Sequence, residues 1–326
     1  MSHQENKCPL ISSSSFTPIY SEETSKKISK DFPHLKEKNI TYLDNAAAGL
    51  YSKSQMDQVH QDLLSNVYCN PHTSGNFGNI RDVKENVREM RHRILSHFNT
   101  TDQNYKVIFT SGATAACKLL AECFPLSTND STFMYLDECH TSVVGMRELS
   151  NRFKVVNEKD VNSKLFCDTK TKSNLFVFPA MSNFCGKKFP SKKWIDMSKD
   201  VSHKNHKQWH ILLDAASYVS TNQLDLEDTQ PDFVCISFYK IFGYPTGIGA
   251  LLVKCSALNT LKKKYFGGGT VDMNLVKQKI HVPKSSSVEG KFTLSVIIEF
   301  DSMIHITLYI KTHIKNFILF YFVLTL

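Results

Sequence analysis

The sequence of 326 residues has no apolar run long enough to span a bilayer and no block of like charges. Its apolar tail, Phe317–Leu326, is only ten residues long, and Lys311, His313 and Lys315 precede it. We therefore expect no membrane span. The formal net charge is +8, but the lysines are scattered and no nucleic-acid-binding motif accompanies them. We expect a surface that attracts anionic ligands, and no binding of nucleic acid.

The nine cysteines lack the spacing of a disulfide framework, and Met1–Leu10 does not have the pattern of a signal peptide. Reduced thiols in a cytoplasmic protein are the simplest expectation. Cys69 and His72 stand three residues apart, as metal ligands can, but no second pair of ligands lies near them in the sequence. The sequence therefore predicts no metal site.

Residues 1–38 are polar, with a serine run at Ser12–Ser15, and predict a flexible leader. From Ile40 onward, helical and strand patterns alternate. A long amphipathic helix is predicted at Ile80–Phe98, and further helices at Ala113–Cys123, Ser142–Ser150 and Lys192–Lys199. Short apolar runs predict six buried strands: Tyr105–Phe109, Thr132–Leu136, Asn174–Phe178, His210–Leu213, Phe233–Phe238 and Ile248–Val253. This alternation favours a doubly wound α/β fold with a mostly parallel sheet, in which ligands bind beyond the carboxyl ends of the strands.

The first strand end with polar residues lies in Val107–Cys117, where an apolar strand is followed by a Ser-Gly turn and a helix. Backbone N–H groups at the start of such a helix can bind an anion, and Ser111 and Thr114 can add hydroxyl donors. An ordinary strand-to-helix turn with a hydroxyl cap is the alternative interpretation.

Two further strand ends carry charged residues. Asp214 follows the apolar strand in Ile211–Ser217 and could be a metal ligand, a general base or a helix cap. Lys240 follows a strand that we expect to be wholly buried, where a lysine is rarely placed for packing. Desolvation lowers the pKa of such an amine and frees it to bond covalently to a carbonyl group. A surface lysine is the alternative, but the nearby Asp214 and the upstream anion site favour the chemical role.

Several stretches between about Asn39 and Thr270 resemble, in the same order, the class V aminotransferases. These are pyridoxal-phosphate enzymes of fold type I, and they include the cysteine desulfurases. Within this group, the chain most resembles the amino-terminal domain of molybdenum cofactor sulfurases. The stretches Ser237–Gly243 and His140–Arg147 favour that branch over the iron–sulfur desulfurases. The matching stretches are Tyr42–Gly49, Asn70–Thr73, Val107–Ala116, Cys139–Arg147, Pro179–Phe184, Leu212–Thr221, Ile236–Val253 and Tyr265–Thr270.

The resemblance implies a role for each site residue. Lys240 would hold pyridoxal phosphate covalently and shuttle protons, and Asp214 would pair with the pyridine nitrogen, which keeps the ring an electron acceptor. His140 would stack over the ring and assist acid–base steps, although a histidine at a helix start is the alternative. Asn183 would hydrogen-bond near the phenolic oxygen of the ring. The cofactor phosphate would be held by Ala113, Thr114, Ser237 and Tyr239.

The resemblance also implies a homodimer, because Gly269 and Thr270 lie where family members reach across to the phosphate bound by the neighbouring subunit. A flexible turn at Gly267–Gly269 is the alternative. Ser217 departs from the iron–sulfur desulfurases, which commonly have glutamine at this place, and a serine is too short to make the same contact directly.

The implied reaction is the desulfuration of L-cysteine to alanine. An enzyme cysteine would take the sulfur as a persulfide and pass it to the molybdenum cofactor, which needs it in xanthine dehydrogenase and aldehyde oxidase. Other interpretations are another class V lyase or aminotransferase, or a catalytically silent fragment that binds pyridoxal phosphate or pairs with a full-length partner. A tail-anchored membrane protein rests on Phe317–Leu326 alone.

After Thr270 the resemblance fades. Family members continue with an arginine-containing stretch and a small domain, whereas Ser286–Lys291 lacks that arginine. None of the cysteines matches the sulfur-accepting position of the family, and Cys139 is the nearest candidate by sequence. We therefore expect a leader (1–38), a cofactor-binding large domain (39–270) and an incomplete, divergent small domain with an apolar tail (271–326). For Ser302–Leu326, we favour sequence outside the ancestral fold over a buried element or a weak membrane-surface anchor.

Overall fold

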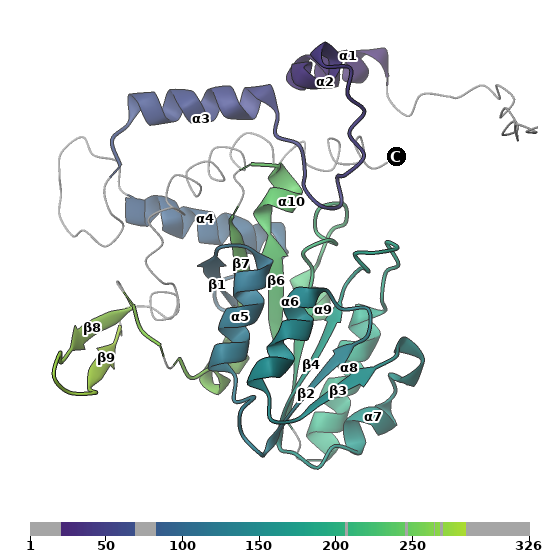
Figure 1. The fold of residues 1–326 in the computed structure, drawn as a ribbon, viewed down its shortest axis with the longest axis vertical. Coiled ribbons are helices and arrows are strands. Elements are labelled where there is room, and N and C mark those ends of the chain that lie inside the picture. The colour runs from purple at the N-terminus through teal and green to yellow at the C-terminus, as the bar shows by residue number, and fades with distance from the viewer. Residues whose placement is uncertain are drawn as a thin grey trace, which may run out of the picture.

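The structure is a computed structural model that describes residues 21–68, 83–205, 208–244, 247–263, 265–267 and 270–284. A seven-stranded sheet has the order β1-β7-β6-β5-β4-β2-β3 (Figure 1). Its strands are β1 (Tyr105–Thr110), β2 (Ser131–Leu136), β3 (Phe153–Val156), β4 (Ser173–Pro179), β5 (Gln208–Asp214), β6 (Phe233–Ser237) and β7 (Gly249–Lys254). Only β7 runs against the direction of the other six, pairing antiparallel with β1 and β6. The predicted mostly parallel sheet is confirmed.

Helices cover both faces of this sheet, and in the view of Figure 1 α5 and α6 lie in front of it. The helices of the described residues are α1 (Glu22–Asp31), α2 (Pro33–Glu37), α3 (Lys53–Ser65), α4 (Val83–His97), α5 (Ala113–Cys123), α6 (Thr141–Val144), α7 (Ser163–Cys167), α8 (Ser191–Asn205), α9 (Leu226–Thr229) and α10 (Phe238–Phe242). One core cluster joins the sheet to α4, α7, α8 and α9, and a second joins it to α5 and α6. The predicted sandwich of a sheet between helices is therefore confirmed.

Strand β4 shows how the sequence produces these two cores. Phe176 and Phe178 point to the α8 side, where the Phe178 ring lies 5.0 Å from the ring of Trp194. Leu175 and Val177 point to the α5 side. Successive side chains of a strand alternate between faces, so a strand covered on both sides needs a continuous apolar run. Such apolar runs predict the inner strands of the sheet.

The structure differs from the predictions at two neighbouring elements. The single helix predicted over Ser142–Ser150 is divided into α6 and a 3-10 helix at Gly145–Leu149. Strand β3 was not predicted, because it lies at the edge of the sheet and has only four residues, with Phe153 and Val155 exposed. Since two of its four side chains are exposed apolar residues, β3 leaves no long buried run in the sequence, unlike the buried edge strand β1.

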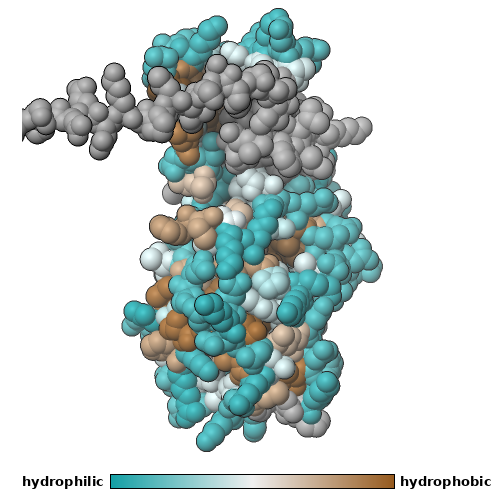
Figure 2. Space-filling model, turned by 90° about the vertical axis from the view of Figure 1, so that its right-hand side faces the viewer, coloured by the Kyte–Doolittle hydropathy of each residue, from teal (hydrophilic) through white to brown (hydrophobic). Residues whose placement is uncertain are grey.

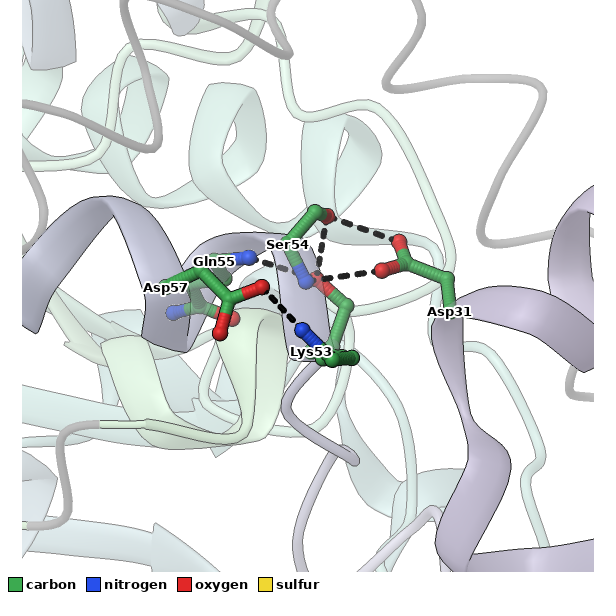
Figure 3. Close-up of polar contacts among 6 residues, drawn as sticks. Asp31, Lys53, Ser54, Gln55 and Asp57 are labelled. Carbon is green, nitrogen blue, oxygen red and sulfur yellow. Dashed lines mark hydrogen bonds and ion pairs between the residues drawn. The ribbon is translucent and has the colours of Figure 1, made fainter.

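Within the predicted flexible leader, residues 22–37 instead form α1 and α2. Ser21 caps α1 by accepting a hydrogen bond from the N–H of Thr24, and Glu22 and Glu23 occupy the first turn, where acidic side chains favour the helix dipole. The carboxylate of Asp31, at the end of α1, accepts hydrogen bonds from Ser54 N and Oγ at 2.8 and 2.9 Å (Figure 3). Local capping and this contact with α3 give the polar segment a fold that hydrophobic periodicity does not reveal.

Beyond the large sheet, β8 (Val271–Asn274) and β9 (His281–Pro283) form a two-stranded antiparallel sheet that projects to one side of the molecule (Figure 1). The face shown in Figure 2 is mostly hydrophilic, with small apolar patches between polar side chains. Among the described residues, no helix is both long enough and apolar enough to cross a membrane. The Ser12–Ser15 run, Asn70–Thr73, Ser286–Lys291 and the apolar tail lie outside the described residues.

Candidate active site

A hollow of about 150 Å³ opens beyond the carboxyl ends of the parallel strands. Each of the strands β1, β2, β4, β5 and β6 delivers lining residues to it from the segment that follows the strand. The lining residues are Ser111, Gly112, Ala113, Thr114, Cys117, Glu138, His140, Ser142, Pro179, Met181, Asn183, Asp214, Ala216, Ser217, Ser237, Tyr239 and Lys240. This is the position that a parallel α/β sheet favours for a ligand. Eight of the nine residues predicted from the sequence line this one hollow.

One end of the hollow is built to accept an anion. Gly112, with φ of +102°, turns the chain from β1 into α5, and no side chain caps the start of this helix. Ala113 N donates a 3.1 Å hydrogen bond to Ser237 Oγ, and Thr114 Oγ1 lies 2.7 Å from Ser142 Oγ. Helix N–H groups and hydroxyl donors converge here, which is the donor set that a phosphate group requires.

Lys240 enters the hollow from α10, the short helix directly after β6. Its Nζ donates a 3.3 Å hydrogen bond to Asn183 Oδ1, on the loop after β4. Burial lowers the pKa of Lys240, although the negative charges of Asp214 and Asp44 partly oppose this. A larger fraction of neutral amine results, which suits attack on a carbonyl group.

Asp214 closes the inner side of the hollow at the end of β5 and is only 8% exposed. Its Oδ1 accepts hydrogen bonds from Ala216 N at 3.1 Å and from Cys235 Sγ at 3.4 Å. These two donors hold one oxygen of the carboxylate in place. The Asp214 carboxylate and the Lys240 amine line the same hollow.

Gly49 and the first turn of α3 hold α10 and the residues after it in place. Gly49 N donates to Tyr239 O at 3.2 Å, and the side-chain Nε2 of Gln55 donates to Tyr244 O at 2.8 Å. Gln55 is buried and lies near the start of α3, where Figure 3 labels it. Gly243 ends α10 with φ of +72°, and a Cβ atom there would lie 2.3 Å from the carbonyl carbon of Leu50. The Lys240 helix is thus fixed on both sides of the lysine.

His140 is both a cavity residue and the cap of a helix. Its Nδ1 accepts a 3.2 Å hydrogen bond from Ser142 N at the start of α6 and lies 2.9 Å from Ser142 Oγ. Because Nδ1 accepts a hydrogen bond, we place the ring proton of the neutral imidazole on Nε2. The helix-start alternative considered for this histidine is therefore compatible with a place in the hollow.

Thr270 is the predicted site residue that does not line the hollow. Its hydroxyl group pairs with Gly267, accepting from Gly267 N at 3.0 Å and donating to Gly267 O at 2.8 Å. Gly269 lies outside the described residues. Thr270 is predicted to contact the phosphate bound by a neighbouring subunit. The structure contains one chain, so this role stays a prediction.

The cysteines near the hollow differ in the state of their thiols. Cys139 donates a hydrogen bond to Val177 O at 3.6 Å, and burial raises the pKa of its thiol well above the ordinary value. A neutral thiol is a poor sulfur acceptor, so the raised pKa disfavours the candidate nearest by sequence. Cys185, on the loop that carries Asn183, is exposed, and a hydrogen bond with Ser182 lowers the pKa of its thiol.

Sequence reasoning missed Glu138, Ser142, Met181 and Cys117 as lining residues. Ser142 stands inside the His140–Arg147 stretch, so its place two residues after the predicted histidine was the available signal. Cys117 lies on the inner face of α5, where a buried thiol cannot be told from a small apolar core residue by pattern alone. Within the described part of the chain, no group of three or more potential metal ligands occurs. Cys69 and His72 lie outside that part.

Comparison with known proteins identifies the family. A family profile described as aminotransferase class-V matches residues 41–298. Molybdenum cofactor sulfurase 1 of Aedes aegypti is 44% identical over 280 residues, which cover 84% of this chain and 36% of the relative. Molybdenum cofactor sulfurase of Homo sapiens is 43% identical over 265 residues, covering 75% of this chain and 29% of the relative. The chain thus spans about a third of the length of these curated relatives.

Solved structures share the fold at much lower identity. The apo structure of cysteine desulfurase from Thermococcus onnurineus NA1 superposes with a TM-score of 0.71 at 17% identity, covering 88% of this chain and 70% of that one. The cysteine desulfurase CsdA of Escherichia coli gives a TM-score of 0.70, also at 17% identity, over 90% of this chain and 72% of that one. The sheet order, the hollow at its carboxyl edge and the profile match agree, and the chain belongs to the class-V aminotransferase family.

Proposed function

We propose that this chain is the pyridoxal-phosphate-binding part of an enzyme of the molybdenum cofactor sulfurase type. The proposed substrate is L-cysteine, the products are alanine and an enzyme-bound sulfur atom, and the sulfur is destined for the molybdenum cofactor. The main support for the proposal is that Lys240 and Asp214 line one hollow, and that hydrogen-bond donors suited to a phosphate group lie at one end of it. The sulfurase names of the relatives at 44% and 43% identity support the choice of substrate.

The donors in the hollow fit pyridoxal phosphate. The start of α5 has no side-chain cap, and Gly112 brings the backbone to the hollow without a side chain. The hydroxyl groups of Thr114 and Ser237 give donors for a phosphate beside the start of α5, where Ala113 N bonds Ser237 Oγ, and Tyr239 lines the same hollow. Asp214 supplies a carboxylate for a protonated ring nitrogen, and Lys240 supplies the amine for the aldehyde.

When bound, the cofactor supplies an electron sink for the carbanion left after a proton is removed from the substrate α-carbon. In this chain, Lys240 would be the group that removes the proton and returns it, since its amine is desolvated and held by Asn183. Asp214 would hold a proton at the ring nitrogen. His140, with the proton on Nε2 and Nδ1 bonded to Ser142, would cover the ring and exchange protons with the substrate thiol.

The proposal extends to assembly and location. A homodimer would bring the Thr270 of one subunit to the phosphate bound by the other, which is why Thr270 need not line the hollow of its own chain. The cytoplasm is the proposed location, because all seven cysteines of the described residues are free thiols.

The decisive experiment is addition of pyridoxal phosphate to the purified chain. We expect an absorbance band at about 420 nm, where this cofactor absorbs when joined to a lysine. Borohydride reduction followed by peptide mapping should place the label on Lys240. Lys240→Ala should abolish the band, whereas Lys172→Ala, which changes a lysine with an 83% exposed side chain, should not. A wild-type chain that binds no cofactor, or is labelled elsewhere, would contradict the proposal.

Substrate identity needs a second measurement on the loaded protein. Alanine released from L-cysteine without a keto acid would support desulfuration, and the extra sulfur should be found by mass spectrometry on a cysteine of the enzyme. Amino-group transfer to a keto acid would instead indicate an aminotransferase. Cofactor binding without turnover would indicate a silent fragment, and mixing with a full-length relative would then reveal mixed dimers.

A further inference from the structure

We propose that Cys235 is a positioning residue for Asp214: its buried thiol donates a hydrogen bond to one carboxylate oxygen and turns the other oxygen toward the hollow. Cys117 supports it as a second thiol in the same chain of hydrogen bonds. The inference rests on the proposed function, because it concerns the carboxylate that would face the ring nitrogen of the cofactor.

The position of Cys235 follows from the register of the sheet. Asp214, the last residue of β5, pairs with Cys235 of the neighbouring parallel strand β6. Cys235 is completely buried, and its Sγ lies 3.4 Å from Asp214 Oδ1. The same oxygen accepts the N–H of Ala216 at 3.1 Å. Two donors from different elements therefore fix one oxygen of the carboxylate.

The second carboxylate oxygen is left for a ligand. Within the described residues, no hydrogen bond to Asp214 Oδ2 occurs, and Asp214 lines the hollow. A carboxylate with one oxygen held by two donors cannot rotate freely about its side-chain torsion. Such orientation by a supporting partner reduces the reorganisation needed when a charged ligand binds.

Cys117 extends the chain of thiols to α5, which packs on the face of the sheet where the Cys235 side chain lies. Its Sγ donates to Cys235 Sγ at 3.7 Å, and Cys117 is 1% exposed at the base of the hollow. The direction of donation therefore runs from α5 to β6 and then to β5. Both thiols are otherwise surrounded by the apolar core that includes Leu212 and Leu251.

The protonation state of Cys235 agrees with its role as a donor. The Cys235 thiol lies in a buried, hydrogen-bonded cluster with Cys117 and next to the charge of Asp214, and this setting raises the pKa of the thiol well above the ordinary value. A neutral thiol can donate to a carboxylate, whereas a thiolate would repel it. The other ionisable groups facing Asp214 are Lys240 from α10 and Cys139 from the loop before α6.

Buried cysteines are often only small apolar core residues, and the experiment must separate that role from hydrogen bonding. The first test uses the cofactor-free protein and infrared spectroscopy of the S–H stretch. A thiol bonded to a carboxylate absorbs at lower frequency than one that is not. We expect the lowest S–H band to disappear in Cys235→Val and to move to higher frequency in Asp214→Asn. Cys123→Ala, which removes another buried thiol of the same core, should leave it in place.

The second test uses protein loaded with pyridoxal phosphate. With one donor to the carboxylate lost, we expect Cys235→Val to bind the cofactor about 3- to 10-fold more weakly. The pH midpoint of the bound-cofactor absorbance should also shift, and loss of core packing alone would not move that midpoint. Cys235→Ser keeps a donor and should stay closer to wild type than Cys235→Val, while Cys123→Ala should match wild type.

An unchanged S–H spectrum in both Cys235→Val and Asp214→Asn would overturn the inference, as would a Cys235→Val titration identical to that of wild type. If Cys235→Val does not fold, the Asp214→Asn spectrum still decides. Failure of the wild-type chain to bind cofactor would contradict the proposed function but would leave the infrared result standing, so the two failures can be distinguished.

Discussion

Lys240 Nζ donates a 3.3 Å hydrogen bond to Asn183 Oδ1, joining the helix after β6 to the loop after β4. Both side chains line the hollow, so this contact sets where the amine stands before a ligand arrives. Asn183→Ala should raise the dissociation constant for pyridoxal phosphate about 3- to 10-fold, the effect of one modest hydrogen bond. Titration by absorbance measures it, with Asn151→Ala, an exposed amide bonded to Ser127 O, as the control. Equal affinities in all three proteins would show that the contact is dispensable.

The lowered pKa of Lys240 predicts its reactivity in the cofactor-free protein. Burial disfavours the ammonium form, so Lys240 should be acetylated with a pH midpoint below that of the exposed Lys172. Asp214 acts in the opposite sense, because its negative charge stabilises the ammonium. Asp214→Asn should therefore lower the Lys240 midpoint further. Competitive labelling followed by mass spectrometry gives both midpoints, and a Lys240 midpoint at or above that of Lys172 would refute the assignment.

The inner strands and the catalytic candidates could be predicted from the sequence because burial on two faces leaves long apolar runs. Asp214 and Lys240 interrupt such runs at their carboxyl ends, where the energetic cost of placing a charge implies a use for it. The parallel sheet then brings these ends together at one edge. Polar residues far apart in the sequence could thus be predicted to share one site.

Some of the elements that were not predicted are stabilised by specific polar contacts, which leave no apolar periodicity in the sequence. Residues 22–37 depend on the Ser21 cap and on Asp31 bonding to Ser54, neither of which produces apolar periodicity. The contact of Cys235 with Asp214 depends on the register of β5 with β6, which a sequence does not reveal. The hydrogen bond from Gln55 to Tyr244 O joins residues that are 189 positions apart in the sequence. Long-range polar contacts of this kind were beyond sequence reasoning.

Gly243 should tolerate no side chain. Its φ of +72° is strained for other residues, and an added Cβ would lie 2.3 Å from the carbonyl carbon of Leu50, where only backbone could move. We expect Gly243→Ala to lower the free energy of unfolding by about 2 kcal/mol or more. Urea denaturation measures this change.

The matched control for Gly243 is Gly145→Ala. Gly145 has φ of −61° and ψ of −21°, and a Cβ there would meet no atom within 4 Å. Alanine should be neutral or stabilise the fold by roughly 0.4–1 kcal/mol, because it reduces the freedom of the unfolded chain. If both variants lost similar stability, the close packing of α10 against Leu50 would not be the cause.

His210 should make the fold less stable in mild acid. The side chain is 3% exposed, its Nε2 lies 3.1 Å from Thr260 Oγ1, and its ring stacks on Phe233. Burial lowers the pKa of His210 below the ordinary value of 6.5, so the unfolded chain binds a proton that the folded chain binds less readily. The stabilising contribution is therefore present above about pH 6.5 and is lost as the pH falls toward the folded-state pKa.

We expect the free energy of unfolding of the wild-type chain to fall between pH 7.5 and 5.5, and to fall less in His210→Gln, which keeps a polar group near Thr260. His92→Gln, on the exposed side of α4, is the control and should follow wild type.

Burial raises the pKa of Asp232, whose carboxyl group has an ordinary value of 3.8. Its contribution is lost as the pH rises, opposite to that of His210, so acid would stabilise the fold if Asp232 dominated this range. Urea denaturation at the two pH values decides between them, and the same decline in His210→Gln as in wild type would rule out His210 as its source.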